Sequence, residues 1–484
     1  MKNTKEKISK PIGAEKVLSF KNKLGYGLGD FANVMSFGMT TSFLMTYYTD
    51  AIGISGSIIA VMFLVARFWD AITDVLMGVI IDKSFAKRME KYKDSEEKID
   101  KFKPYFKWGA WIVSGTAIMM FLMPQSWNMG AKIGFMYVTY ILWGMAYTFV
   151  NIPYGSIASV MTMNTEERAE LSVARGLGSS VGQQVPKLFV PFVLGMFGVN
   201  LAGGYLTAMI ILSIVALASY YLCYFFVEEN IQTPTEKKQE KTSFTEYIRV
   251  ILKNRLLIGV ALGSVAILAG LLTNGQMMVY YFQSIVGNLQ AMGLITSITI
   301  IPTFVLAPIL PKLVERFSNK KVITTATLLA TGVFIIFQLI PFNIVSYIIL
   351  YVLGVALLNI PMTLVWGMVS DCIDYNQFLT GNRQEGVIYG SYSFVRKIGQ
   401  ALSGFIAGMG ISAIGYIKPI DGVHQVQSAE TLAGIKFLHI GFTAICSFIA
   451  FLAFQYIWNL TEEKRDLMVK AISEGKTIDD VDSI

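Results

Sequence analysis

The chain has 484 residues, of which 54% are hydrophobic and 15% are charged, and its formal net charge is +7. Soluble domains average about 25% charged residues. This composition therefore excludes a soluble enzyme, a disulfide-rich secreted scaffold and a disordered protein. Three cysteines and two histidines are too few and too scattered for a disulfide framework, a zinc site or a haem site. The polar, basic first 23 residues indicate no cleavable signal peptide.

Twelve apolar segments follow one another along the chain, and each is long enough for the roughly 20 residues that cross a bilayer. They lack the ten-residue alternating pattern of a membrane barrel, so we expect an all-α membrane protein. In chain order the expected spans are 24–49, 54–82, 104–127, 131–162, 172–197, 203–227, 256–286, 290–314, 322–341, 344–370, 386–417 and 432–460.

Basic residues predict the orientation of these spans, because cytoplasmic loops of membrane proteins are enriched in Lys and Arg. Seven lysines precede the first span, the connection 83–107 holds nine basic residues against five acids, and 237–255 holds six basic residues. The loops on the opposite side carry only Lys132, Lys418 and Lys436. Both termini are therefore predicted to be cytoplasmic, and the positive net charge reflects these loops rather than a nucleic-acid partner.

One long polar interruption separates the first six spans from the last six. The expected organisation is a cytoplasmic N-terminal segment, a six-helix bundle, a central cytoplasmic loop, a second six-helix bundle and a cytoplasmic tail. These parts cover 1–23, 24–228, 229–255, 256–460 and 461–484. The layout resembles the plan of the major facilitator transporters. The long polar loop 84–100 is expected to form a solvated amphipathic helix on the cytoplasmic face.

Charges inside a bilayer cost about 2.5–3.5 kcal/mol each at the helix centre, so they indicate function. The second span contains Arg67, Asp70 and Asp74 at spacings that place all three on one helix face. One positive and two negative charges leave a net charge of −1, which a bound Na⁺ or a proton would neutralise. Alternatively, Arg67 pairs with Asp70 as a structural bridge, which leaves Asp74 unexplained.

Polar residues in two other spans provide surfaces that can face these acids. The fourth span contains Tyr147, Thr148 and Asn151, and Pro153 interrupts its backbone hydrogen bonding. Thr and Asn in membrane helices also bond neighbouring helices without further function. The first span contains Asp30, which is either part of a polar cavity or an interfacial cap.

Basic residues in the later spans predict a polar ligand. Arg175 lies near the start of the fifth span, and Arg396 and Lys397 lie well inside the eleventh. Such groups, with aromatic rings nearby to stack on sugars, suit an anion or a ligand with many hydroxyls. Ordinary helix packing is the alternative for each ring. The aromatic candidates are Trp143, Tyr147, Trp366, Tyr389 and Tyr392.

Several motifs together resemble the glycoside–pentoside–hexuronide:cation symporters, the melibiose permease-like family of the major facilitator superfamily. They read LGYGLGDFANVM, TYYTDAIGIS, FLVARFWDAITDVLMG, ILWGMAYTFVNIPYGS, SDCIDYNQFLTGNRQEG and YGSYSFVRKIGQALSG. The resemblance runs from about residue 22 to 460. It implies secondary active uptake of a sugar with a cation by alternating access, in a bacterial cytoplasmic membrane.

The resemblance also implies roles for particular residues. It assigns the cation site to Asp70, Asp74 and Thr148. It places Asp30, Arg175 and Lys397 at or beside the sugar, lined by Tyr147 and Asn151. It further implies a cytoplasmic charge network that closes an inner gate. The residues of that network are Arg168, Asp371, Asp374, Arg383 and Glu385.

Three positions depart from the family pattern. Asn151 stands where the family has a sugar-binding Asp, and Gly155 replaces a Trp, which removes a stacking surface. Thr73, between the two acids of the second span and itself a fourth candidate residue of the cation site, replaces an Asn associated with Na⁺. The loss of that amide oxygen weakens the case for Na⁺ and makes H⁺ at least as good a candidate for the coupled ion.

The hypothesis with most support is therefore a symporter that couples a sugar or glycoside to H⁺ or Na⁺, with membrane lipid as its other partner. Two alternatives are a lipid or lysolipid carrier of the same fold and a non-transporting membrane sensor. An enzyme is not expected, because the sequence has no nucleophile–base pair, no metal cluster and no phosphate-binding loop in a strand–helix context. No cofactor is expected, and no metal apart from a transported Na⁺.

Overall fold

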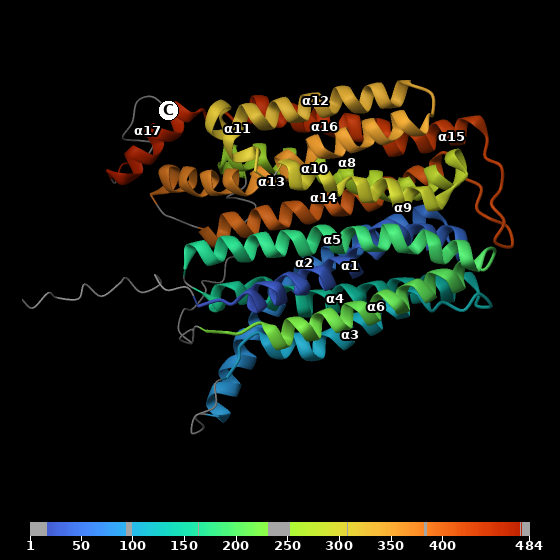
Figure 1. Ribbon diagram of the computed structural model, residues 1–484, viewed down its shortest axis with the longest axis horizontal. Helices are drawn as coiled ribbons and strands as arrows, with labels where there is room; N and C mark the ends of the chain where they lie inside the picture. Colours follow the sequence, from blue (N-terminus) through green and yellow to red (C-terminus); the bar gives the residue numbers. More distant parts are fainter. Residues whose placement is uncertain are drawn as a thin grey trace, which may run out of the picture. The chain divides into compact units, whose positions relative to one another are not determined.

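The structure is a computed structural model, and it describes residues 17–92, 99–162, 164–230, 252–306, 308–381, 385–474 and 476. The described chain is helical almost throughout (Figure 1). In chain order its helices are α1 (Phe20–Thr46), η1 (Tyr47–Ala51), α2 (Gly56–Lys91), α3 (Lys103–Phe121), α4 (Met129–Met161), α5 (Thr165–Phe197), α6 (Leu201–Phe226), α8 (Arg255–Tyr281), η2 (Phe282–Val286), α9 (Leu289–Ile298), α10 (Ile300–Leu306), α11 (Leu310–Phe317), α12 (Asn319–Leu339), α13 (Ile344–Thr380), α14 (Glu385–Ala413), α15 (Ala429–Lys436), η3 (Phe437–Gly441), α16 (Phe442–Leu452), η4 (Ala453–Ile457) and α17 (Glu462–Ser473).

Every apolar span expected from the sequence falls on a helix or on a run of helices. Eight helical stretches among the described residues are long and apolar enough to cross a membrane, judged by length and composition. The expected span 290–314 is divided into α9, α10 and α11. Pro302, Pro308 and Pro311 explain this division, because proline has no N–H to continue the helical hydrogen bonding.

The chain divides into two compact units. The first consists of Met1–Thr40, Ile72–Val193 and Ala202–Lys238, and the second of Thr41–Ala71, Leu194–Leu201 and Gln239–Ile484. The second unit therefore includes the end of α1 and the first part of α2 as well as the C-terminal helices. Helices α1 and α2 run from one unit into the other.

In the first unit, glycines let α1 and α5 approach closely. A Cβ atom on Gly27 would lie 2.8 Å from the carbonyl oxygen of Ala174, and one on Gly182 would lie 2.6 Å from that of Phe31. Real Cβ atoms do not come so near to backbone oxygens, so only glycine fits at these positions. This contact sets the register of α5 against α1, which carries Asp30.

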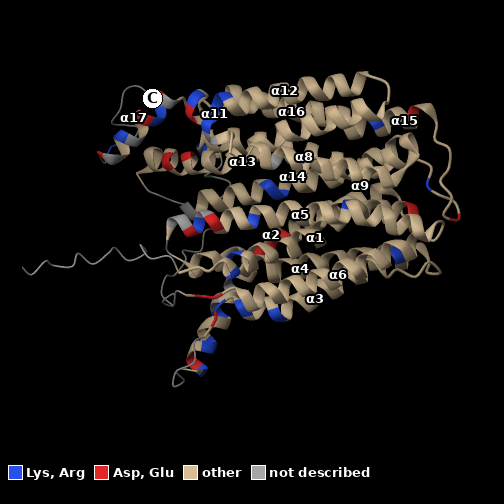
Figure 2. Ribbon diagram, viewed as in Figure 1, with Lys and Arg blue, Asp and Glu red and all other residues tan. Residues whose placement is uncertain are grey.

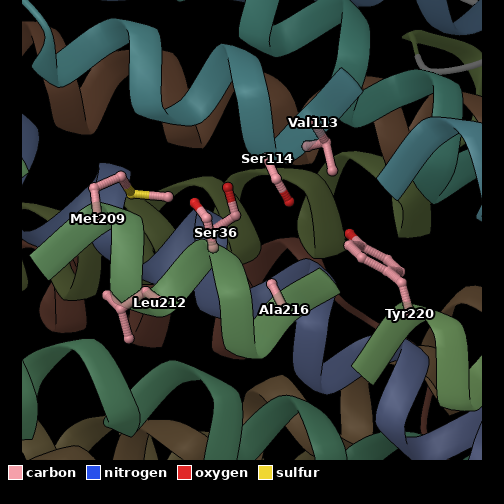
Figure 3. A pocket seen from close by; sticks show the side chains of 8 residues that line it. Ser36, Val113, Ser114, Met209, Leu212, Ala216 and Tyr220 are labelled. Atoms are coloured by element: carbon pink, nitrogen blue, oxygen red, sulfur yellow. The ribbon is translucent and has the colours of Figure 1, made fainter. Parts of the chain in front are cut away.

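Hydrogen bonds between side chains join further helices to α1. The Trp143 indole of α4 donates to Ser36 Oγ at 3.0 Å, and the Tyr220 hydroxyl of α6 donates to Asn33 Oδ1 at 2.7 Å. A cavity of about 10 Å³ lies beside these contacts, with Ser36, Ser114 and Tyr220 around it (Figure 3). That volume is comparable to one water molecule, so this cavity is far too small for a sugar.

The second unit contains a buried polar cluster around His439 of η3. Its Nε2 lies 2.8 Å from the Tyr347 hydroxyl of α13, and its Nδ1 lies 3.0 Å from the Asn274 carbonyl of α8. The Asn274 amide in turn donates to the His439 carbonyl at 2.6 Å. Both ring nitrogens thus have partners, so this histidine joins three helices as a satisfied core residue.

Charged residues are distributed unevenly along the helices of each unit. Figure 2 shows most Lys, Arg, Asp and Glu at one end of the helices, with few at the other end and few between. Such an asymmetry is typical of a membrane protein whose charged end faces the cytoplasm. The charged residues that lie between the two ends therefore need a functional explanation.

Candidate functional site

Helix α2 carries the acids of the predicted cation site. In the second unit, the Arg67 guanidinium lies 3.0 Å from Asp70 Oδ2, and Asp70 is buried. Lys397 of α14 donates to the backbone carbonyl of Asp70 at 3.1 Å. The Arg67–Asp70 bridge considered as an alternative is therefore present, and Lys397 contacts the backbone of Asp70 at that position.

In the first unit, one turn further along α2, Asp74 contacts the fourth predicted span. The Thr148 hydroxyl of α4 donates to Asp74 Oδ1 at 2.9 Å, and Thr148 is buried. Thr73, beside Asp74 on α2, is also buried. The structure thus brings together two of the four residues predicted for the cation, and they come from different helices.

Around Thr148, α4 presents aromatic and amide groups. Tyr147 lies between two aromatic rings, with centroids 5.5 Å from Trp143 and 5.9 Å from Phe37. Asn151 is half-buried one turn beyond Tyr147. Pro153 lies inside α4 and has no N–H to donate. The backbone carbonyl of Phe149, four residues earlier, therefore has no helical hydrogen bond from this position.

Asp30 and Arg175, both predicted beside the sugar, lie next to each other in the first unit. Arg175 Nε is 3.5 Å from Asp30 Oδ1, and Asp30 is only 5% exposed. The Arg175 guanidinium also lies over the ring of Tyr154, 5.5 Å from its centroid. That ring is stacked on Tyr26 with a centroid separation of 4.9 Å. An acid, a base and two aromatic faces are therefore gathered inside apolar helices.

The second unit has a similar combination of aromatic and basic groups. Trp366 of α13 is stacked on Tyr389 with centroids 5.6 Å apart, and it meets the edge of Tyr392 at 5.3 Å. The Arg396 guanidinium lies 5.2 Å from the Trp366 ring centroid. Tyr392 is fully buried, and its hydroxyl lies 3.1 Å from Ser264. Tyr392 is thus a packed neighbour of Trp366, whereas Trp366 is 39% exposed.

The residues of the predicted inner gate have diverse surroundings. Asp371 of α13 is buried and accepts a hydrogen bond from Arg465 Nε at 2.8 Å, beside a cavity of about 200 Å³. Arg168 donates to the Thr162 carbonyl at 3.0 Å, and Asp374 is half-buried on α13. Arg383 lies outside the described residues. Glu385 is the first residue of α14, and its side chain is also outside the described part.

Sequence reasoning missed two of these arrangements. It did not identify Arg465 as the partner of Asp371. It also did not identify Tyr26 and Tyr154 as the stack that supports Arg175. Tyr26 lies in the first quoted motif and Tyr154 in the fourth, but no spacing within the chain predicts that they meet.

Comparison with known proteins identifies the family. A family model described as MFS/sugar transport protein matches residues 25–462. The chain belongs to this family. The match confirms the resemblance to sugar:cation symporters inferred from the sequence motifs, and it makes the chain a multi-pass membrane protein.

Relatives of this MFS sugar transporter have similar lengths. It is 31% identical over 463 residues to an uncharacterized symporter, YjmB, of Bacillus subtilis, with 96% of this chain and 97% of the relative covered. It is 28% identical to the glucuronide carrier protein homolog of Escherichia coli, covering 95% and 97%. It is 29% identical to a putative sulfoquinovose importer of Salmonella typhimurium, covering 95% and 94%.

Solved transporters share the fold. The nucleoside transporter NupG matches with a TM-score of 0.62 at 13% identity, covering 91% of this chain and 99% of that structure. A D-xylose-proton symporter matches with a TM-score of 0.60 at 14% identity, covering 95% and 99%. These matches support a major facilitator fold for the sugar transporter described here.

Proposed function

We propose that the protein is a symporter that imports a sugar or glycoside together with a monovalent cation across a bacterial cytoplasmic membrane. In this proposal all twelve predicted spans cross the bilayer, both termini are cytoplasmic, and transport proceeds by alternating access. Sugar uptake is coupled to the cation if the carrier reorients readily with both sugar and cation bound or with neither bound, and slowly with only one of them bound. The ligands then act through their different affinities for the two states.

The observation that carries the proposal is the hydrogen bond from Thr148 to Asp74. An intramembrane carboxylate with a hydroxyl from a second helix supplies the hard oxygen ligands that a small cation needs, and it can also take up a proton. In the proposed site Asp74 is the principal cation-binding residue, with Thr148 and Thr73 as further oxygen donors. Asp70, which pairs with Arg67, is its acidic neighbour on α2.

For the sugar, we propose the residues that the resemblance and the aromatic rings indicate, taken one unit at a time. Asp30, Arg175, Tyr147 and Asn151 contribute from the first unit, because carboxylate, guanidinium and amide groups bond hydroxyls in specific directions. Lys397, Trp366 and Tyr392 contribute from the second; Trp366 supplies the stacking face, and Tyr392 supports it. Two relatives are named for glucuronide and sulfoquinovose, which are acidic sugars. An anionic sugar is therefore the first candidate substrate, and Arg175 and Lys397 are the candidate basic residues in their respective units.

The inner gate is proposed to involve Arg168, Asp371, Asp374, Arg383 and Glu385. The pair formed by Asp371 and Arg465 supports this assignment, because a buried carboxylate with a guanidinium partner is an interaction that can be exchanged between two states. In this proposal Arg465 is a further member of the gate.

The test is uptake into proteoliposomes of a panel of labelled glucuronides, sulfoquinovose and neutral glycosides. The panel is run once with an imposed pH gradient and once with an imposed Na⁺ gradient. Accumulation driven by one gradient would establish symport and identify the cation. Exchange of sugar without accumulation would show that the protein is a facilitator rather than a symporter. The absence of flux for every sugar in the panel would refute the proposed function.

A further inference from the structure

A further buried acid lies in the second unit, and none of the roles above is assigned to it. Asp50 belongs to η1, the π-helical turn at the end of α1, and only 6% of its surface is exposed. It follows the predicted span 24–49 and precedes α2. Extra residues in a π turn are frequent at functional sites, because they redirect side chains from the regular helix surface.

The partners of Asp50 are hydroxyl groups. Thr49 donates to Asp50 Oδ1 at 2.8 Å, and Tyr416 donates to Asp50 Oδ2 at 3.1 Å. The Tyr280 hydroxyl of α8 lies 2.7 Å from Thr49 Oγ1 and extends the chain of hydrogen bonds. Among the residues that the structure describes, no Lys or Arg lies within ion-pair distance of Asp50. The nearby Lys418 ammonium instead donates to the Gly53 carbonyl at 2.9 Å.

This hydroxyl network can accommodate both protonation states of Asp50. When Asp50 is ionised, Thr49 donates to it. When Asp50 carries a proton, it can donate to Thr49, whose own hydrogen then turns to the Thr46 carbonyl 3.3 Å away. Tyr280 can donate to Thr49 in either case, because a hydroxyl oxygen has two lone pairs. A change of protonation therefore needs only hydroxyl rotations and no movement of the backbone.

The packing around Asp50 favours the neutral form. A Cβ on Gly408 of α14 would lie 2.5 Å from the Gly56 carbonyl, so α2 and α14 touch through their backbones at the start of α2. The backbone N–H of Ser57 donates to Ser412 Oγ at 2.8 Å. Asp50 itself is 6% exposed and has hydroxyl partners, and a buried carboxylate with such partners is disfavoured relative to the acid.

We propose that Asp50 is a proton-binding site separate from Asp70 and Asp74. Asp50 carries the proton while the end of α1 and the start of α2 pack on α8 and α14. It releases the proton when these segments separate and water reaches the carboxyl group. The ligand is a proton, transferred to and from water at a carboxylate oxygen. The binding of this proton stands independently of sugar transport, whereas its role in the transport cycle rests on the proposed function.

The proton can be detected by its infrared signature. Purified protein in liposomes is titrated while the carbonyl band of protonated carboxyl groups is recorded. At about pH 6, where an exposed Asp is ionised, we expect the protonated band of the unmodified protein to lose intensity in Asp50→Asn. The matched control is Asp421→Asn, which removes an exposed acid from the segment after α14 and should leave the band at about pH 6 unchanged.

A second variant keeps the proposal testable if Asp50→Asn does not fold. Tyr416→Phe removes a hydrogen bond that the ionised carboxylate accepts more strongly than the neutral acid does, so the band should persist to higher pH than in the unmodified protein. Identical spectra of the unmodified protein and Asp50→Asn at about pH 6 would overturn the proposal. So would a band in Tyr416→Phe that titrates as in the unmodified protein.

The conformational part of the proposal has its own measurement. In Ser57→Cys, labelling by an impermeant thiol reagent reports whether the segments at Asp50 have separated. We expect labelling to accelerate as pH rises, and this pH dependence to disappear when Asp50→Asn is added. Labelling that is independent of pH would refute the conformational link. A titrating band in a protein that transports no sugar would refute the proposed function and leave the proton site intact.

Discussion

Thr148 holds the Asp74 carboxylate through a single hydroxyl at 2.9 Å. A hydrogen bond to a charged group contributes about 1.5–3 kcal/mol, and Val has nearly the same shape as Thr without the hydroxyl. We therefore expect Thr148→Val to raise the cation concentration for half-maximal uptake about 10-fold or more. The matched control is Thr139→Val in the same helix, because the Thr139 hydroxyl bonds only within α4. Equal effects of the two substitutions would contradict the assignment.

Asp74 is the residue on which coupling should depend. Asp74→Asn keeps the size of the side chain and a partner for Thr148, but it removes the charge that a cation or proton neutralises. We expect gradient-driven accumulation to be abolished, while exchange of sugar across the membrane is partly retained. The measurement is uphill uptake beside counterflow in the same proteoliposomes. Unimpaired uphill uptake in this variant would refute the role of Asp74.

At the scale of helices, the contact of α1 with α5 positions Asp30 beside Arg175. Gly182→Ala places a Cβ 2.6 Å from the Phe31 carbonyl, and overpacking of this kind costs about 1–3 kcal/mol. Gly176→Ala is the matched control in α5, since its Cβ would meet nothing within 4 Å. We expect a lower melting temperature and weaker sugar binding only for Gly182→Ala. A control that is equally destabilised would show that helix packing is not the cause.

Helix α17 contributes Arg465 to the buried Asp371 of α13. Arg465→Gln leaves that carboxylate without its guanidinium, and a buried carboxylate without a partner is destabilising. We expect a reduced melting temperature that is largely restored by adding Asp371→Asn, because neighbouring partners are non-additive. Since Arg465 is half exposed, the effect should be moderate. Additive losses in the double variant would show that the two residues act independently.

At the scale of the whole molecule, the distribution of charge predicts the orientation in the membrane. A reporter that folds only in the cytoplasm should be active when fused to the C-terminus. A periplasmic reporter inserted in the exposed segment at Asp421, between α14 and α15, should be active there and inactive at the C-terminus. The reverse pattern would overturn both the predicted topology and the proposed direction of uptake.

Much of the helical framework was predictable because membrane helices are local features. A run of apolar residues long enough to cross the bilayer satisfies its own backbone, whatever its neighbours are. The exception is 290–314, where Pro302, Pro308 and Pro311 divide one apolar run into three helices. The expectation of a single span followed the apolar composition of this segment and did not take its prolines into account, although they are present in the sequence.

The candidate site was predictable only in part. Intramembrane charges are costly, so Asp30, Asp74 and Arg175 are conspicuous in the sequence alone. Their partners are not, because Thr148 and Asp74, or Arg465 and Asp371, are far apart in the chain. Asp50 was overlooked for the same reason: it stands at the edge of a predicted span, and only packing buries it.

The sequence by itself therefore determined that this protein is a helical membrane transporter of the MFS sugar family, through hydropathy, charge and motifs that need no tertiary contacts. The tertiary structure decided which acid meets which base or hydroxyl. The physical reason is that such partners meet only when glycines such as Gly27 and Gly182 let helices approach to backbone distance. Desolvation then gives each polar pair its strength, and desolvation is a property of packing rather than of sequence order.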